Sequence, residues 1–490
     1  MRPTALLLAL LLTGCALAPR YERPQGLAPK EFRDAAAVTV DQPAGTEKTF
    51  GELDWWEVFE DEQLQALIRQ GLEYNYDIRA AAQRVLQAQA QAIATQSGLF
   101  PSVSASAQGD KTDRFQIGST PLEAQKSLLG SRDPSAGSES FMSALNLAWE
   151  LDFWGRIRSA SEASRAQLLA TEAGRQAVIQ SVVTGIAQAY LDLRESDLEL
   201  EIAKTTLASR QKSLKLVQAR KQWGVATRLD VRQSEALLET AAATIPLIEA
   251  QIAQAENYIS ILIGADPGAV PRGKSLNDQQ MTIEVPAGLP SSLLDRRPDL
   301  RAAEEQLIAA NANVGEARAA LFPQITLTAA LGTVSPALAG VFDGPTGVTN
   351  VAPAAVLPLF NAGKLRAGVQ AAKAQREEAL LNYQKAVQQA LREVSDALIG
   401  CTKAKEARDQ MEALVNTWRD AAHLSQLRYI GGVTSYLEVL DSERQLFDAE
   451  LNYAQAKRNE LLTVVALYKA LGGGWENTAP KPQAQAEAQK

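Results

Sequence analysis

Two long stretches of the chain carry apolar residues at a seven-residue spacing. No proline interrupts residues 155–223, where one apolar row contains Ile179, Ile186, Leu193, Leu200, Leu207 and Leu214. A second row follows a short break at Gly224 and contains Val231, Leu238, Ile245, Ile252 and Ile259. Apolar residues at this period form the packing seam of a coiled coil. We therefore expect two long helices that fold back on each other as an antiparallel hairpin over residues 155–263.

The break between these helices has a second copy later in the chain. The segment RKQWGVATRLDVRQSEALL (220–238) aligns without gaps with RYIGGVTSYLEVLDSERQL (428–446), an offset of 208 residues. The second copy lies within its own seven-residue row, which contains Val387, Val394, Cys401, Arg408, Val415, Ala422, Val439, Leu446, Tyr453, Glu460 and Leu467. The pattern predicts a second helical hairpin over 363–472. Its turn, Gly432-Val433, matches Gly224-Val225, so each hairpin ends in the same tip.

Shorter stretches ahead of each hairpin alternate between apolar and polar residues. They predict strands at about 99–112 and 139–154 in the first repeat, and at about 321–334 and 348–360 in the second. A period of two with one apolar face is typical of outer-membrane barrel strands, which need about 9–11 residues per crossing. A soluble hairpin with one dry face has the same pattern and remains an alternative. No later stretch is expected to be long and apolar enough for a transmembrane helix.

These elements predict a mainly α-helical fold with a small β part and two internal repeats. We divide the chain into a lipidated N-terminal segment (15–60), a first repeat (61–263), a Pro- and Gly-rich linker (264–295), a second repeat (296–475) and a disordered tail (476–490). Each chain has only four predicted strands, whereas bacterial barrels begin at about 8. Three copies would supply about 12 strands and a usable lumen. We therefore expect a homotrimer with an outer-membrane β-barrel on an α-helical periplasmic tunnel.

The N-terminus predicts export and lipid attachment. Residues 1–14 have a basic start and an apolar core too short to span a bilayer, which is typical of a signal peptide. The run Leu12-Thr13-Gly14-Cys15 resembles a bacterial lipobox, which would make Cys15 the lipid attachment site in the outer membrane of a Gram-negative bacterium. An ordinary signal peptide that contains a Cys is the alternative. Acylation of Cys15 would leave Cys401 as a buried hydrophobe without a disulfide partner.

Composition excludes several other functions. The net charge is -8 with interspersed signs, which gives no basic stripe for nucleic acid. The chain has one His, His423, and no phosphate-binding loop or nucleophile with a His partner, so we expect neither an enzyme nor a metal site. No cofactor is expected beyond the lipid on Cys15.

Several motifs resemble those of the TolC-like outer-membrane factors, most closely the OprM-like (NodT-type) efflux lipoproteins. They are GCALAPRYERP (14–24), WWEVFEDEQLQALI (55–68), RRPDLRAAEEQLIAANANVGEARAALFPQI (296–325), RYIGGVTSYLEVLD (428–441) and YKALGGGW (468–475). The resemblance implies a trimeric passive exit duct of a tripartite pump, joined by a periplasmic adaptor to an inner-membrane transporter. The cargo implied is drugs or other small toxic compounds.

The resemblance also assigns roles at the hairpin tips. It implies a periplasmic gate lined by Leu437 and Asp441 with Glu438 close by. The implied tethers between hairpins are Arg428, Tyr429 and Asp230, and the implied adaptor-docking tips are Gly224, Val225, Gly432 and Val433. Thr434 stands where some relatives have a basic residue that holds neighbouring hairpins together. Arg428 is therefore expected to make more of the contacts between hairpins. The alternative is that Leu437 only packs in the seam between the helices and that Asp441 is only a solvated charge on the helix surface.

Two other functions remain open on the sequence. A type I protein-secretion exit channel would have the same fold. A periplasm-spanning coiled-coil protein without a pore would also account for the helical rows. Measuring conductance in a planar bilayer distinguishes a coiled-coil protein without a pore from a channel.

Overall fold

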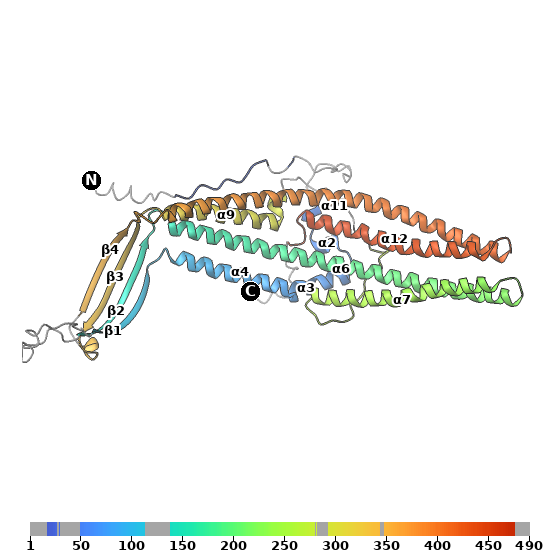
Figure 1. The fold of residues 1–490 in the computed structure, drawn as a ribbon, viewed down its shortest axis with the longest axis horizontal. Coiled ribbons are helices and arrows are strands. Elements are labelled where there is room, and N and C mark those ends of the chain that lie inside the picture. The colour runs from blue at the N-terminus through green and yellow to red at the C-terminus, as the bar shows by residue number, and fades with distance from the viewer. Residues whose placement is uncertain are drawn as a thin grey trace, which may run out of the picture. The chain divides into compact units, whose positions relative to one another are not determined.

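A computed structural model describes residues 17–26, 29, 50–112, 138–279, 281, 293–343 and 347–475. The prediction of a mainly α-helical chain with a small β part is confirmed (Figure 1). The signal peptide, Cys15 and the tail 476–490 lie outside the described residues. Contacts divide the chain into two compact units, Met1–Glu22, Gln87–Leu168 and Glu305–Leu380 against Arg23–Leu86, Leu169–Glu304 and Leu381–Lys490. Each unit takes segments from both repeats.

The strands belong to the first unit and form one antiparallel sheet in the order β1-β2-β3-β4 (Figure 1). Their bounds are β1 Ser102–Thr112, β2 Ser138–Leu151, β3 Gln324–Ser335 and β4 Gly347–Val356. The register aligns Val103, Leu147, Ala329 and Val351 in one row across all four strands. Directly opposed residues share a face of the sheet, so the alternation in each strand adds up to one apolar face.

Among the described residues, nothing covers that apolar face. Val103, Leu145, Leu331 and Val351 are each more than half exposed, at 68%, 53%, 59% and 68%. The strand order also leaves β1 and β4 as the two edges of the described sheet. An exposed apolar face with two open edges is unstable in water and requires other surfaces to cover it.

The strands begin later than the sequence predicts. The predicted starts are Leu99 and Leu321, whereas β1 begins at Ser102 and β3 at Gln324. The intervening Leu-Phe-Pro residues belong to the helix ends, because Gly98, Leu99 and Phe100 donate backbone hydrogen bonds to Thr95, Gln96 and Ser97. The second strand of each repeat also ends earlier, at Leu151 and Val356. Proline removes a backbone donor, so the ladder starts after it.

The helices form two hairpins of matching length (Figure 1). The first consists of α6 (Arg156–Gln222) and α7 (Arg228–Leu262), and the second of α11 (Lys364–Ile430) and α12 (Tyr436–Ala470). The other helices among the described residues are η2 (Phe50–Glu52), α2 (Trp55–Val58), α3 (Glu62–Tyr74), α4 (Tyr76–Ser97), α8 (Leu293–Arg296), α9 (Pro298–Ala319) and α10 (Gly340–Asp343).

The buried face of α6 changes along the helix. Ile186 and Leu193 from the predicted row are fully buried, but Leu207 and Leu214 are only half-buried. Nearer the tip the buried row is Ala203, Arg210 and Val217. An α-helix drifts by about 20° per heptad relative to a strict seven-residue repeat, so a long straight helix passes from one row to the next.

Charged residues in the predicted row of the second hairpin pair with each other. Arg408 of α11 and Glu460 of α12 form an ion pair of 3.1 Å. Burial alone would raise the pKa of Glu460, but hydrogen bonds from Arg408 and Lys457 hold it below its ordinary value. The pair therefore replaces an apolar contact within the seam.

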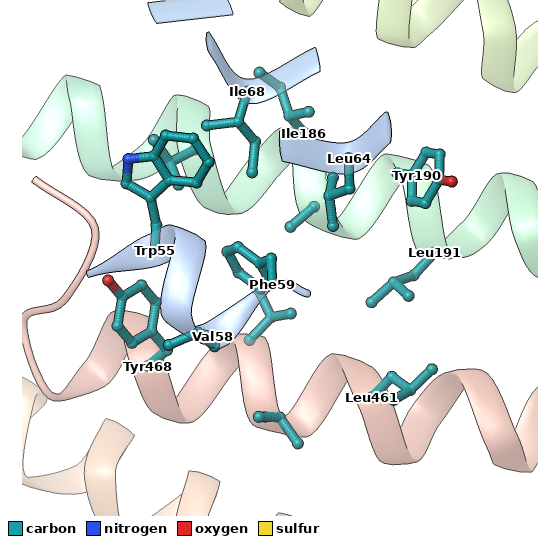
Figure 2. Packing of buried hydrophobic residues seen from close by; sticks show 14 of the residues in the cluster. Trp55, Val58, Phe59, Leu64, Ile68, Ile186, Tyr190, Leu191, Leu461 and Tyr468 are labelled. Atoms are coloured by element: carbon teal, nitrogen blue, oxygen red, sulfur yellow. The ribbon is translucent and has the colours of Figure 1, made fainter. Parts of the chain in front are cut away.

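The core of the second unit is built by the segment that precedes the first repeat's hairpin (Figure 2). Trp55, Phe59 and Leu64 are fully buried and pack between α6 and α12. The Tyr468 ring meets Phe59 edge-on at 6.0 Å, and its hydroxyl donates to the Leu53 carbonyl at 2.7 Å. The short helices therefore fix the spacing of α6 and α12 far from the tips.

Asp61 attaches the described part of the linker to this core. Its Oδ2 accepts hydrogen bonds from the Tyr190 hydroxyl at 2.9 Å, Gln279 Nε2 at 2.6 Å and the Lys274 backbone N at 2.9 Å. Its Oδ1 accepts from the Gln63 backbone N at 2.9 Å and caps α3. Residues 264–279 of the linker are thus a packed segment, with Val270 and Leu276 also buried.

One helix corrects an expectation about membrane crossing. In the described part of the chain, α7 is long and apolar enough to span a bilayer by length and composition, with 17% of its most apolar window buried. However, Val231 of α7 packs in one cluster with Tyr436 of α12, and Ile248 of α7 packs in another with Phe447 of α12. These contacts are those of a bundle helix.

Candidate functional site

The two hairpin tips have the same backbone geometry. Gly224 and Gly432 have φ values of 75° and 74°, a left-handed conformation that glycine adopts without strain. The Val225 N–H donates to the Arg220 carbonyl at 2.9 Å, and the Val433 N–H to the Arg428 carbonyl at 3.0 Å. Val225 and Val433 are 64% and 72% exposed. The predicted docking residues therefore lie at two equivalent, uncovered turns.

The acidic residues that follow the turns cap their own helices or pair locally. Thr227 and Asp230 form a capping box, in which the Thr227 N–H donates to Asp230 Oδ2 at 2.7 Å. At the equivalent position of the second tip, Glu438 accepts a hydrogen bond from Thr434 and lies 3.5 Å from Arg428 Nε. Thr434 and Arg428 thus both bind Glu438 within their own hairpin.

The predicted gate residues share one exposed side of α12. Leu437 is 61% exposed, and Asp441 follows it one helical turn later. The Asp441 carboxylate has one ion-pair partner in the described chain, Arg444 on the same helix at 3.3 Å. A large apolar side chain and a carboxylate therefore point away from the chain's own core.

Tyr429 is the predicted tether that joins the two hairpins. It is 6% exposed, its ring lies 4.6 Å below the Arg220 guanidinium, and it meets Tyr436 edge-on at 5.3 Å. Arg220 Nη1 also donates to the Ile430 carbonyl at 3.1 Å. Burial raises the pKa of the Tyr429 phenol, so it stays neutral near pH 7. Within the chain this contact is made by Arg220, the repeat equivalent of Arg428, and the part of Arg428 in holding hairpins together stays a prediction.

A second contact between the hairpins was not predicted from the sequence. Arg210 of α6 is 2% exposed, donates to the Leu237 carbonyl at 2.7 Å and lies 4.9 Å from the Phe447 ring centroid. Ser213 donates to Glu443 at 3.0 Å. Burial lowers the pKa of Arg210 and raises that of Glu443. The sequence does contain a signal for this contact, because Arg210 lies seven positions from both Ala203 and Val217 in one row along the helix.

No group of three His, Cys, Asp or Glu suited to a metal ion occurs among the described residues. Cys401 is buried, and burial raises the pKa of its thiol. His423 is exposed. The arrangement at the tips can pack, pair charges and present surface.

Comparisons with known proteins cover nearly the whole chain. The profile of the outer membrane efflux protein family matches residues 67–265 and 289–473. The cation efflux system protein CusC of Escherichia coli is 33% identical over 97% of this chain and 100% of its own length. The toluene efflux pump outer membrane protein TtgF of Pseudomonas putida is 35% identical over 97% of each chain.

Solved structures agree with these matches. The open state of the Neisseria gonorrhoeae MtrE outer membrane channel has a TM-score of 0.83 and 32% identity. The match covers 95% of this chain and 100% of that one.

Proposed function

Since this chain belongs to the outer membrane efflux protein family, it is an outer-membrane component of an efflux system, and we propose that three copies form its passive exit duct. The resemblance inferred from the sequence motifs is thereby confirmed. The protein is located in the outer membrane of a Gram-negative bacterium and extends into the periplasm.

The observation that carries the proposed trimer is the uncovered apolar face of the sheet. Val103, Leu145 and Val351 are exposed on that face, and lipid can cover them where water cannot. The open edges β1 and β4 can pair with those of neighbouring copies, since a sheet within lipid must close to satisfy its backbone. Three four-stranded sheets give about 12 strands, a number with room for a lumen.

The native mass and the conductance of the purified protein test this assembly. We expect a mass of three chains in detergent, and stepwise ionic currents after insertion into a planar bilayer. A mass of one or two chains would contradict the trimer. A trimer that never conducts would instead support a periplasm-spanning structural protein without a pore.

The proposed partners are a periplasmic adaptor and an energised inner-membrane transporter. The exposed turns at Val225 and Val433 are available to the adaptor at the ends of both hairpins. The relatives differ in cargo, cations for CusC and toluene for TtgF, although both match this chain over nearly its whole length. We therefore propose drugs or other small toxic compounds as cargo, chosen by the transporter. Co-purification of adaptor and transporter tests the partnership.

Cys15 is proposed to carry a covalent lipid. Changing Cys15 to Ser should abolish incorporation of a radioactive fatty acid, because the thiol is the attachment atom. Several acyl chains on one residue anchor a protein more stably than one chain can. The matched control is Cys401→Ser, which should keep full label since that thiol is buried. Label that persists in the Cys15 variant would contradict the assignment of Cys15 as the attachment site.

A further inference from the structure

The N-terminal residues 17–23 are held against α9, and we call them the strap. At the first end of the strap, Arg318 Nη1 donates to the Leu17 carbonyl at 3.3 Å. Asn311 Nδ2 donates to the Pro19 carbonyl at 2.6 Å, and Asn311 is buried. Side chains of α9 therefore bind the backbone of the strap, and the position of this end does not depend on the strap's own side chains.

Arg23 fixes the other end of the strap. Its Nε and Nη2 donate to the two carboxylate oxygens of Glu304 in α9, at 2.8 Å and 2.5 Å. Its Nη1 donates to Asp295 of α8 at 2.9 Å. The Glu304 side chain is only 13% exposed, and a two-point pair between guanidinium and carboxylate fixes orientation as well as distance. Arg23 is thus bound to the start of the second repeat.

The length of the strap matches the length of helix that it follows. The chain from Leu17 to Arg23 crosses six residue steps and reaches at most about 20–22 Å. In the opposite direction, α9 rises about 21 Å over the fourteen residue steps from Glu304 to Arg318. The arginine side chains that close the two ends supply the remaining reach. The strap therefore has little slack between its attachment points.

Gly315 lets the strap lie close to α9. A Cβ atom at this position would lie 2.6 Å from the Ala18 Cβ of the strap and 2.8 Å from Ser159 Oγ of α6. Both distances are shorter than real Cβ contacts. Any side chain at Gly315 would therefore displace the strap from the helix.

The first repeat shows that this binding site is specific to α9. Its equivalent helix is α4, and both helices have an Asp-x-Arg-Ala-Ala start and a Leu-Phe-Pro end at an offset of 222. At that offset Glu304 corresponds to Ala82, and Gly315 corresponds to Ile93. Ile93 is 61% exposed. The carboxylate and the glycine that hold the strap are thus differences between two otherwise similar helices.

We propose that the strap is a spacer of fixed length that holds the lipid of Cys15 level with the junction of α9 and β3, so that the sheets of neighbouring copies meet at the same height. This inference rests on the proposed lipid and the proposed trimer. Cys15 is two residues from Leu17, so the two Cα atoms lie within about 7 Å of each other. Leu17 in turn binds Arg318, in the last turn of α9 before β3.

A common height matters because the edges β1 and β4 have to pair between copies. A strand rises about 3.3 Å per residue, and a slip of one residue turns every side chain to the opposite face of the sheet. A four-stranded sheet also keeps two open edges until the ring closes, and lipid cannot satisfy them. A lipid held at one height in every copy therefore favours correct pairing, whereas a freely hanging lipid does not.

Insertion of a flexible linker tests this role. A Gly-Ser linker of about six residues between Ala16 and Leu17 keeps both lipid and strap but separates them by up to about 20 Å. We expect the yield of folded trimer in the outer membrane, measured on an unheated gel, to fall several-fold while fatty-acid label stays at the wild-type level. The same linker inserted after Gly26, which lies beyond the strap, is the matched control and should keep the wild-type yield.

The outcomes of this experiment separate the inference from the proposals on which it rests. Wild-type protein without label would remove the lipid, and labelled wild-type protein with a native mass of fewer than three chains would remove the trimer. A labelled trimer that forms equally well with the linker at Leu17 would overturn the strap's role alone. Equal losses from both insertions would overturn it too, because the effect would then belong to any longer N-terminus.

Combining variants gives a readout that a purely structural strap would not give. Arg23→Gln should lower the yield of trimer several-fold, and Arg20→Gln is its control, because Arg20 is exposed in the same strap. In a chain that already has the linker before Leu17, Arg23→Gln should cause no further loss, since the strap no longer sets the height of the lipid. Additive losses would show that Arg23 only stabilises the fold, and equal losses from Arg20→Gln would show that the pair with Glu304 has no special part.

Discussion

Replacing Leu437 and Asp441 by alanine is expected to raise the conductance of the isolated channel several-fold and to sensitise cells to large antibiotics. Both side chains project from the same exposed side of α12. In the proposed trimer, three Leu437 side chains meeting on the axis exclude water and ions. Three Asp441 carboxylates add a negative ring that attracts cations. Single-channel recording and drug susceptibility measure the loss of both rings.

The first hairpin supplies a matched control for this experiment. Leu229 is the repeat equivalent of Leu437 and is 63% exposed against 61%. Leu229→Ala should leave conductance unchanged, because the gate is assigned to the second hairpin. If the Leu437 and Asp441 double variant is a folded trimer with wild-type conductance, the second hairpin serves docking alone. An equal rise in both variants would instead indicate general loosening of the tips.

Asp61→Ala is expected to destabilise the helical unit by more than about 3 kcal/mol. The carboxylate accepts hydrogen bonds from Tyr190, Gln279 and the Lys274 backbone, and it is 2% exposed. Each donor left buried without a partner costs about 1–3 kcal/mol. Chemical unfolding followed by the helical signal in circular dichroism measures the difference in detergent.

Asp54 is the matched control for Asp61, because it also caps a short helix in the same segment. Its side chain is half-buried and, among the described residues, contributes only to the capping box of that helix, so Asp54→Ala should cost about 0.5–2 kcal/mol. Equal losses for the two variants would mean that Asp61 acts only as a cap. The linker would then gain nothing from its hydrogen bonds to Asp61.

The same carboxylate gives a pH dependence with a defined sign. Burial alone would raise the pKa of Asp61, but hydrogen bonds from Gln279 and Tyr190 outweigh it and hold the pKa below its ordinary value. A lowered pKa stabilises the folded state above about pH 4, and this stabilisation is lost as the pH falls through the folded-state value. Asp61→Asn should therefore flatten the acid limb of the stability curve. An unchanged acid limb would show that other carboxylates produce it.

Local patterns predicted the elements well because they depend on near neighbours. The seven-residue rows and the Gly-Val turns gave both hairpins, and alternation gave the four strands. The strand starts were predicted too early because apolar residues at Leu99 and Leu321 continue the alternation, whereas the ladder begins only after the proline that follows them. The family and its site residues came from motifs, and their roles at the gate remain proposals.

Partners across the chain could not be read from the same patterns. Arg220 and Arg428 occupy equivalent positions in nearly identical turns, yet Arg220 covers Tyr429 while Arg428 pairs with Glu438 in its own hairpin. Arg210 looks like a surface charge in the sequence and is buried against Phe447. Asp61 looks like a helix cap and also binds a linker residue that is more than 200 positions away.

The sequence by itself determined the two repeats, the hairpins, the amphipathic strands and the family, because periodicity and motifs are properties of adjacent residues. Only the tertiary structure decided which copy of each repeated position is buried. The two turns have the same backbone geometry but different surroundings in one chain. The second hairpin covers one side of the first hairpin, and no described residue covers the equivalent side of the second. That asymmetry arises from packing between segments about 200 residues apart, which no local pattern encodes.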